Sequence, residues 1–302
     1  MNIAKKTAFP LLLCMALLTG CSGTTQSDAE LPPIDSLIAE EQPSQPETAP
    51  TYTGRIYYAS DHGTVAPGSM TRLQAELEAA GNTWQADALA AVPATSDTIL
   101  LLNAPSEDIT QADADALDAF FDAGGHLLLV MPANEAPVRY KYLERVLEEY
   151  CIRMDYDLVT DAAEGHSVKD TNAVLMQRID LPEGMHMAES AYSTPLLMDN
   201  VRSFAFFYNE GYGSIKMDAL LETDTTAVGT PCGGTEEDPE VFENMPLMTM
   251  LYAYDDKRLN SSVVAIGSGD FLTDVNYDEP LSEAPRTLLT SSIEWMIWLN
   301  NR

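Results

Sequence analysis

Apolar runs and amphipathic segments alternate through the first half of the chain. Short apolar or β-rich runs at 55–59, 98–103 and 126–131 predict buried strands. The segment 69–80 and the one that begins after Thr110 carry apolar residues at helical spacing, so they predict helices between those strands. Strands that alternate with helices are typical of a parallel sheet with helices on its faces.

The helix after Thr110 has well-marked ends. Thr110 and Asp113 have the spacing of a capping box, with an acid near the positive end of the helix dipole. Gly124 and Gly125 end the helix before the next strand. Three acids on its polar side predict a face exposed to solvent: Asp115, Asp118 and Asp122.

A further helix is predicted from Pro137 to Tyr150, and an alternating segment follows at 153–159. We expect the apolar members of this segment to point into the core and the charged members into solvent, because successive strand residues face opposite sides. The apolar set is Met154, Tyr156 and Leu158, and the charged set is Arg153, Asp155 and Asp157.

The pattern changes in the second half of the chain. Helical periodicity is weak from about 165 to 255, where the short strand candidates are 173–179, 203–208, 214–221 and 247–254, and 229–239 has the composition of a loop. The α/β pattern returns with a buried strand at 263–267, a short turn and a helix at 285–299. The sequence therefore predicts one α/β body at 51–302 with a β-rich insertion at about 165–255.

The N-terminus has the features of an export signal. Two lysines precede an apolar run at 8–18, which is too short to span a bilayer. The run ends in Leu-Thr-Gly-Cys, which resembles the lipobox of bacterial lipoproteins, in which the cysteine is acylated. We predict a lipoprotein signal peptide at 1–20 and lipidation of Cys21, with the protein held at the extracytoplasmic face of a cell membrane. A secretory signal with a chance cysteine is the alternative.

Residues 21–50 predict a tether between the lipid and the folded body. The stretch 22–50 has five prolines, six acids and no Lys or Arg. A segment of this composition cannot bury enough apolar surface to fold.

The excess of acidic residues argues against two classes of binding partner. The 302 residues include 16 Lys+Arg against 47 Asp+Glu, which gives a formal net charge of −31. This excess of acid argues against nucleic acid as a partner and against attraction to an anionic lipid surface. Membrane attachment would therefore depend on the lipid at Cys21.

Four segments, in this order, resemble a known protein family. They are YYASDHG at 57–63, TILLLNAPSEDITQADADALDAFFDAGGHLLLVM at 98–131, VVAIGSGDFLTD at 263–274 and LLTSSIEWM at 288–296. Together, over about residues 52–300, they resemble the gliding-motility-type (GldG-like) auxiliary component of ABC transporters, an "ABC-type uncharacterized transport system" domain.

The resemblance implies a flavodoxin-like parallel sheet of the class I glutamine amidotransferase type. It also implies a non-catalytic extracytoplasmic protein whose partners are an ABC permease and ATPase. Two departures stand out. Many relatives carry membrane helices, whereas this sequence ends at Arg302 directly after its last predicted helix, and a lipid anchor would take their place. Relatives also tend to have Gly-His-Gly where 60–63 reads Ser-Asp-His-Gly.

Three residues mark a candidate ligand crevice. His62 and Asp270 follow predicted strands, where an open α/β sheet binds ligands, and Ser268 lies beside Asp270. A small molecule or a cation is the candidate ligand. In the simpler interpretation, the small residues at 267–269 allow a tight turn, Asp270 caps it and His62 is a loop histidine.

Catalysis is a weaker hypothesis. A serine hydrolase would use Ser268, but its surroundings fall short of the G-x-S-x-G pattern. A cysteine enzyme of the amidotransferase type would need a sharp strand-to-helix turn, whereas Cys151 follows a helix and Cys232 lies in a loop. We therefore predict a protein without catalytic activity. Whether Cys151 and Cys232 form a disulfide is left open.

Acidic clusters at 236–240 and 274–279 lack the spacing of a calcium-binding loop. We predict that they are solvated surface, and that the protein has no metal site and no cofactor.

Overall fold

The computed structural model describes residues 52–134, 138–168, 171–187, 196–207, 213–232, 241–279 and 282–302. The chain divides into two units, Met1–Ala49 and Pro50–Arg302, and only the second contains described residues. The predicted signal peptide, the lipidation of Cys21, the tether and the helix start at Pro137 lie outside them. No helix among the described residues is both long and apolar enough to cross a membrane.

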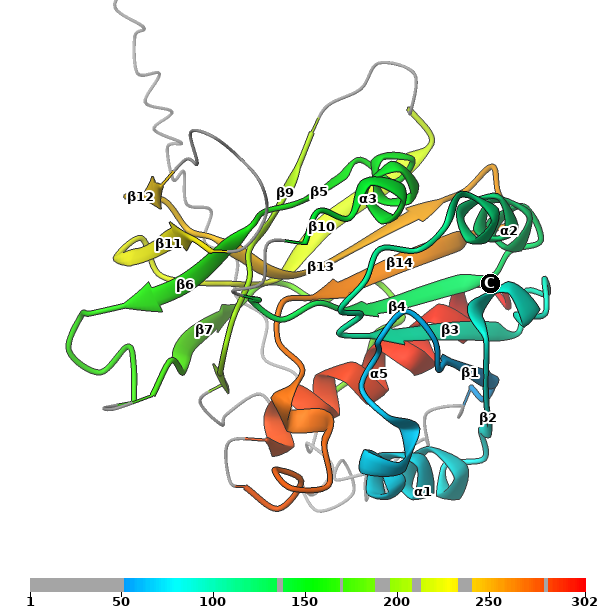
Figure 1. Ribbon diagram of the computed structural model, residues 1–302, viewed down its shortest axis with the longest axis horizontal. Helices are drawn as coiled ribbons and strands as arrows, with labels where there is room; N and C mark the ends of the chain where they lie inside the picture. The colour runs from blue at the N-terminus through cyan, green and yellow to red at the C-terminus, as the bar shows by residue number, and fades with distance from the viewer. Residues whose placement is uncertain are drawn as a thin grey trace, which may run out of the picture. The chain divides into compact units, whose positions relative to one another are not determined.

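Five parallel strands form one half of a large sheet (Figure 1). They lie in the order β2-β1-β3-β4-β14, with every neighbouring pair parallel. Their bounds are β1 Arg55–Ala59, β2 Thr83–Asp87, β3 Thr98–Asn103, β4 His126–Val130 and β14 Ser261–Ile266. The chain runs outward from β1 to β2 and returns to the other side of β1 at β3. In an open sheet wound this way, ligands bind outside the carboxyl ends of the strands.

Helices cover both faces of this half of the sheet. Figure 1 shows α2 (Gln111–Asp122) and α3 (Lys141–Glu148) on one face, and α1 (Thr71–Ala79) and α5 (Glu283–Leu299) on the other. Alternate residues of each central strand join the two separate cores. In β3, for example, Leu101 packs in the core of α1 and α5, and Leu102 in the core of α2 and α3. The continuous apolar runs of β3, β4 and β14 are fully buried because both faces are covered.

The predicted α/β class is confirmed, as is the capping box of α2. The Thr110 hydroxyl accepts from the Asp113 N–H at 3.2 Å, and the Asp113 carboxylate accepts from the Thr110 N–H at 2.9 Å. The finer assignment to a flavodoxin-like family of folds stays a prediction.

Antiparallel strands complete the sheet beyond β14. The order continues β14-β13-β10-β7-β8, and β9 joins β13 to β5. A second sheet has the order β12-β11-β6. The bounds are β5 Ile152–Met154, β6 Asp157–Asp161, β7 Val174–Arg178, β8 Leu196–Met198, β9 Phe204–Phe206, β10 Ile215–Glu222, β11 Ala227–Pro231, β12 Phe242–Glu243 and β13 Met248–Asp255.

The expected outward direction of Asp155 and Asp157 is wrong. Asp155 is 8% exposed and Asp157 1%, while Leu158 is only half-buried. The alternation breaks because the segment is two strands, and β6 leaves the main sheet to pair with β11. Ser203 offsets part of the free-energy cost of burying Asp157, because its N–H and its hydroxyl both donate to the Asp157 carboxylate, at 2.9 and 2.7 Å. Burial still raises the pKa of Asp157, and it raises that of Asp155 to about 6.

Replacing Asp155 should remove a pH dependence of stability. Between pH 3.8 and about 6 the folded chain keeps a proton on Asp155 that the unfolded chain releases, so the free energy of unfolding falls as pH rises through this range. We expect the stability of Asp155→Asn relative to the wild type to increase by roughly 2–3 kcal/mol from pH 4 to pH 7, measured by urea denaturation. The exposed Asp256→Asn is the control and should show a flat difference. A flat difference for Asp155→Asn as well would contradict the argument.

Candidate functional site

A loop segment crosses the carboxyl end of β14 in direct backbone contact. The Arg202 N–H donates to the Gly267 carbonyl at 2.8 Å, and the Ala133 N–H after β4 donates to the Asn200 carbonyl at 2.8 Å. A Cβ on Gly267 would lie 2.0 Å from the Arg202 carbonyl oxygen, so only glycine fits there. This close approach is a structural reason for glycine at position 267, and it does not require that the turn hold a nucleophile.

Ser268 holds the same crossing in place. Its side chain is buried, at 1% exposure, and its hydroxyl donates to the Asp199 carbonyl at 2.6 Å. A serine nucleophile needs a base that takes its hydroxyl proton. Here the Ser268 hydroxyl donates its proton in a hydrogen bond to a backbone carbonyl rather than to a base. The side chain therefore connects the segment 199–202 to the turn after β14.

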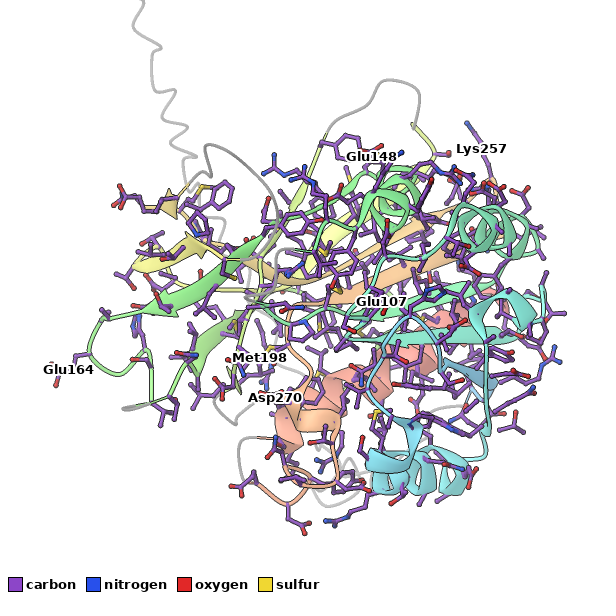
Figure 2. The ribbon with its side chains drawn as sticks, viewed as in Figure 1. Glu107, Glu148, Glu164, Met198, Lys257 and Asp270 are labelled. Carbon is purple, nitrogen blue, oxygen red and sulfur yellow. The ribbon has the colours of Figure 1, made fainter. Side chains whose placement is uncertain are left out.

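Asp270 begins a short 3-10 helix (Asp270–Leu272) and faces the same crossing segment. Its carboxylate accepts from the Asn200 side-chain amide at 2.8 Å, and its carbonyl accepts from the Asn276 amide at 3.0 Å. Figure 2 shows Asp270 and Met198 close together at the edge of the sheet. The half-buried carboxylate therefore keeps acceptor capacity on its second oxygen.

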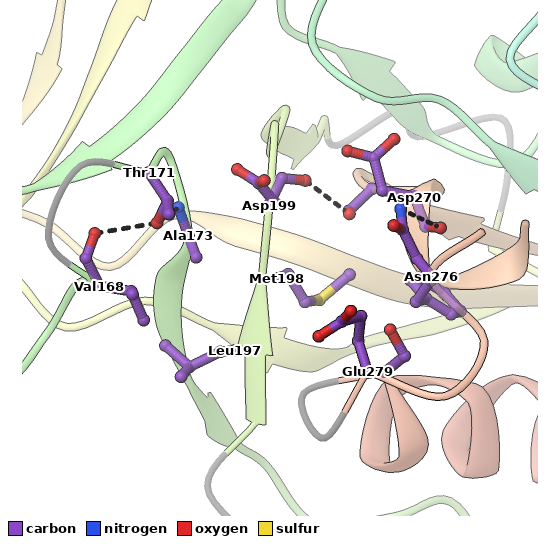
Figure 3. Close-up of a pocket in the computed structure, with 12 residues that line it drawn as sticks. Val168, Thr171, Ala173, Leu197, Met198, Asp199, Asp270, Asn276 and Glu279 are labelled. Carbon is purple, nitrogen blue, oxygen red and sulfur yellow. Dashed lines mark hydrogen bonds between the residues drawn. The ribbon is translucent and has the colours of Figure 1, made fainter.

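Ser268 and Asp270 line one pocket of about 190 Å³ (Figure 3). Figure 3 shows the carboxylates of Asp199, Asp270 and Glu279 around this space, from the end of β8, the 3-10 helix and the loop before α5. Its apolar wall includes Leu197, Met198 and Phe271. Acid side chains and an apolar wall suit a small organic solute with donor or cationic groups.

His62 lies elsewhere and does not line this pocket. Two strands, β3 and β4, separate β1 from β14, which is about 14 Å at the usual spacing. The His62 side chain is 11% exposed, and its Nε2 lies 3.2 Å from an Asp113 carboxylate oxygen at the start of α2. Its backbone has a left-handed φ of 56°, and its carbonyl accepts the N–H groups of Ser106 and Glu107. His62 thus joins the loops after β1 and β3.

Other acids in loops cap helices from a distance. The Asp108 carboxylate accepts from the Tyr142 and Leu143 N–H groups at the start of α3, at 2.9 and 3.2 Å. Asp274 does the same for Thr71 and Arg72 at the start of α1, at 3.1 and 2.9 Å. The N-caps of these helices, Met70 and Tyr140, form no side-chain cap of their own. Carboxylates at a helix N-terminus are stabilised by the unpaired N–H groups and the dipole there.

Sequence reasoning missed these distant caps. From the sequence, Asp274 is predicted to belong to a solvated cluster, and Asp108 has no predicted role. The signal that could have found them is a helix start without Ser, Thr, Asp or Asn at its own N-cap, which requires an acceptor from another part of the chain.

Asp115 and Asp122 are exposed as predicted, whereas Asp118 is half-buried, and its burial and the nearby Glu149 carboxylate raise its pKa. Each of the three has an arginine close by. Arg145 lies 3.2 Å from Asp115 and 3.9 Å from Asp118, and Arg258 lies 2.7 Å from Asp122. Arg258 also pairs with Glu149 at 2.6 Å and so links α2 to the end of α3.

Neither cysteine lines the acidic pocket. Cys151 is buried after α3 and Cys232 is half-buried after β11, and within the described residues no disulfide joins them. The same part of the chain contains no group of three or more His, Cys, Asp or Glu side chains that could hold a metal ion.

Comparison with known proteins gives a fold but no family. No family model matches the chain, and no curated protein matches it. Among solved structures, the "mmIFT52 N-terminal domain" is similar with a TM-score of 0.57 at 12% identity, over 80% of this chain and 97% of that one. An α-L-fucosidase isoenzyme 2 from Paenibacillus thiaminolyticus has a TM-score of 0.42 at 11% identity, over 81% of this chain and 33% of that one. The first likeness concerns the fold alone, and the second is too weak to support an argument.

Replacing Gly267 should strongly destabilise the body. The new Cβ of Gly267→Ala would meet the Arg202 carbonyl, so we expect a loss of about 3 kcal/mol in urea denaturation. The control is Gly68→Ala, because a Cβ at Gly68 has nothing within 4 Å and should change stability by about 0.5 kcal/mol or less. Equal stabilities for the two variants would contradict the close approach at Gly267.

Proposed function

We propose that this protein is a non-catalytic binding or scaffolding module, held at the extracytoplasmic face of a cell membrane by lipid on Cys21. Its proposed partners are the permease and ATPase of an ABC-type transport system. The resemblance of the four sequence segments supports this choice of partner.

One observation about the carboxyl edge of the sheet supports a module without catalysis. This edge is where α/β enzymes place their reacting groups. Here Ser268 donates to a backbone carbonyl, and Asp108 and Asp274 accept the N–H groups that begin α3 and α1. Side chains engaged in this way stabilise loops and helix starts, and a surface with such fixed loops suits the recognition of a partner.

Lipidation is the first part of the proposal to test. We expect Cys21→Ala to leave the membrane fraction of the producing bacterium, because an acyl anchor requires the thiol. Cys14→Ala is the matched control, since Cys14 lies in the segment that the signal peptidase would remove, and it should stay with the membrane. Metabolic labelling with a fatty acid analogue gives a second readout. Labelled Cys21→Ala would contradict the proposal.

The partner is tested by crosslinking the lipidated protein in its native membrane and identifying the captured chains. We expect an ABC permease and its ATPase to be enriched over a control capture with Cys21→Ala, which lacks the anchor. Recovery of the protein only as a monomer after mild detergent, with no crosslinked partner, would count against the transport role and leave the anchor intact.

The pocket beside Asp270 favours a second candidate function, binding of a small solute. Asp199, Asp270 and Glu279 give it an acidic lining, and in the described part of the chain no metal cluster is present. A small organic amine or a sugar therefore fits its chemistry better than a metal ion.

A thermal-shift screen tests this candidate, because a solute that binds only the folded chain must stabilise it. A hit should raise Tm in the wild type and in the exposed control Asp256→Asn, and should raise it much less in Asp270→Asn. A screen of amines and sugars without any shift would make the pocket an unattractive ligand site.

A further inference from the structure

Arg202 is a buried charge at the carboxyl edge of the sheet. The residue is 1% exposed and lies in the segment that crosses the end of β14, with its N–H on the Gly267 carbonyl. It follows the residues that line the acidic pocket, but Arg202 itself is not in that lining. Arg202 belongs to no recognised sequence motif.

The guanidinium of Arg202 lacks the partners that a buried charge normally has. Within the described residues, neither Nε nor Nη1 has a hydrogen-bond acceptor. Both oxygens of the nearby Asp157 carboxylate take their hydrogen bonds from Ser203. Arginine stays charged in proteins, and buried charges are almost always paired or bound to an ion.

Aromatic rings form the surroundings of this guanidinium. The Arg202 Cζ lies 5.2 Å from the centroid of the Tyr156 ring, within cation–π distance. Tyr156 stacks on Tyr140 with an interplanar angle of 15° and a centroid separation of 6.4 Å. The Tyr140 hydroxyl donates to the Pro105 carbonyl after β3, which fixes the rings over the ends of the parallel strands.

A second guanidinium lies against the same ring. The Cζ of Arg139 lies 5.1 Å from the Tyr156 centroid, so two guanidinium groups flank one aromatic side chain. Arg139 has a carboxylate close by, since its Nε lies 3.9 Å from Glu144, to which the Tyr156 hydroxyl donates at 2.5 Å. Of these two arginines, it is Arg202 whose buried nitrogens lack an acceptor within the described residues. Tyr156 and Cys232, which both lie near Arg202, are only half-buried.

We propose that Arg202 is the binding group of an oxyanion site, which takes the carboxylate or phosphate group of a small solute. The planar guanidinium donates to both classes of oxyanion, and its burial strengthens these charged hydrogen bonds. Tyr156 forms one wall of the site. The position at the carboxyl ends of β4 and β14 is one where open α/β sheets bind ligands. This site is separate from the acidic pocket and goes beyond the scaffolding role.

The experiment follows the thermal unfolding of the full-length lipidated protein in mild detergent. Inorganic phosphate is titrated in one arm and succinate in another, with sodium chloride holding the ionic strength constant. One arm or both should raise Tm in a saturable way, by roughly 3–6 °C at ten times Kd, and the responding arm identifies the class of oxyanion.

Two variants assign the effect to Arg202. Arg202→Met keeps the length of the side chain without its charge, and it should lose the saturable rise. Arg55→Met is the matched control, because Arg55 is an exposed arginine paired with Asp97 at the start of β1, and it should keep the rise. Without added oxyanion, Arg202→Met should unfold at the wild-type Tm or above it, since it removes an unpaired buried charge.

Several results would overturn the proposal. They are no saturable rise in either arm, the same rise in Arg202→Met as in the wild type, or a much lower Tm for Arg202→Met without oxyanion. An equal rise would reflect general exclusion of these salts from the protein surface. A much lower Tm would show that the guanidinium has a partner within the chain. If Arg202→Met does not fold, Arg202→Lys is the variant that tests the proposal. Lysine keeps a positive charge but lacks the planar guanidinium, so we expect it to raise the Kd for the oxyanion at least tenfold.

Discussion

The backbone contact between Gly267 and the segment 199–202 determines what the carboxyl edge of this sheet can do. β14 ends against another stretch of chain rather than against solvent, and the Arg202 carbonyl leaves no room for a side chain at Gly267. Ser268 fastens the crossing from one side through the Asp199 carbonyl. Beyond the crossing, Asp270 lines the acidic pocket, and Arg202 lies buried next to Tyr156.

Much of the parallel half could be predicted from the sequence. The strands β1, β3, β4 and β14 each contain an unbroken apolar run of four residues, because strands covered on both faces are rich in apolar residues. β2 was missed because it lies at the edge of the sheet, where four of its five residues are exposed and the sequence TWQAD has no apolar run. β8 and β12, with three and two residues, are too short for any periodicity to appear.

The candidate site could be predicted only in part. Strand ends are visible in the sequence, so His62 and Asp270 were found at the correct edge. Their separation depends on the order of the strands, which places β3 and β4 between the two loops. Arg202 could not be recognised as buried, because its segment has no regular element and its burial comes from contacts far along the chain. A single basic residue between Val201 and Phe204, just before the apolar run at 204–207, is the available hint.

The place of β14 in the sheet also constrains how the protein reaches its folded state. β14 lies between β4 and β13 and joins the parallel half to the antiparallel half, yet it comes from residues 261–266, near the end of the chain. A chain that emerges N-terminus first therefore carries β4 with an unpaired edge until almost all of it has appeared. Asp274, which caps the start of α1, lies still further along the chain, some 200 residues after the helix that it stabilises. The parallel half of the sheet and the start of α1 can therefore be completed only when residues 261–274 are available to pair with them.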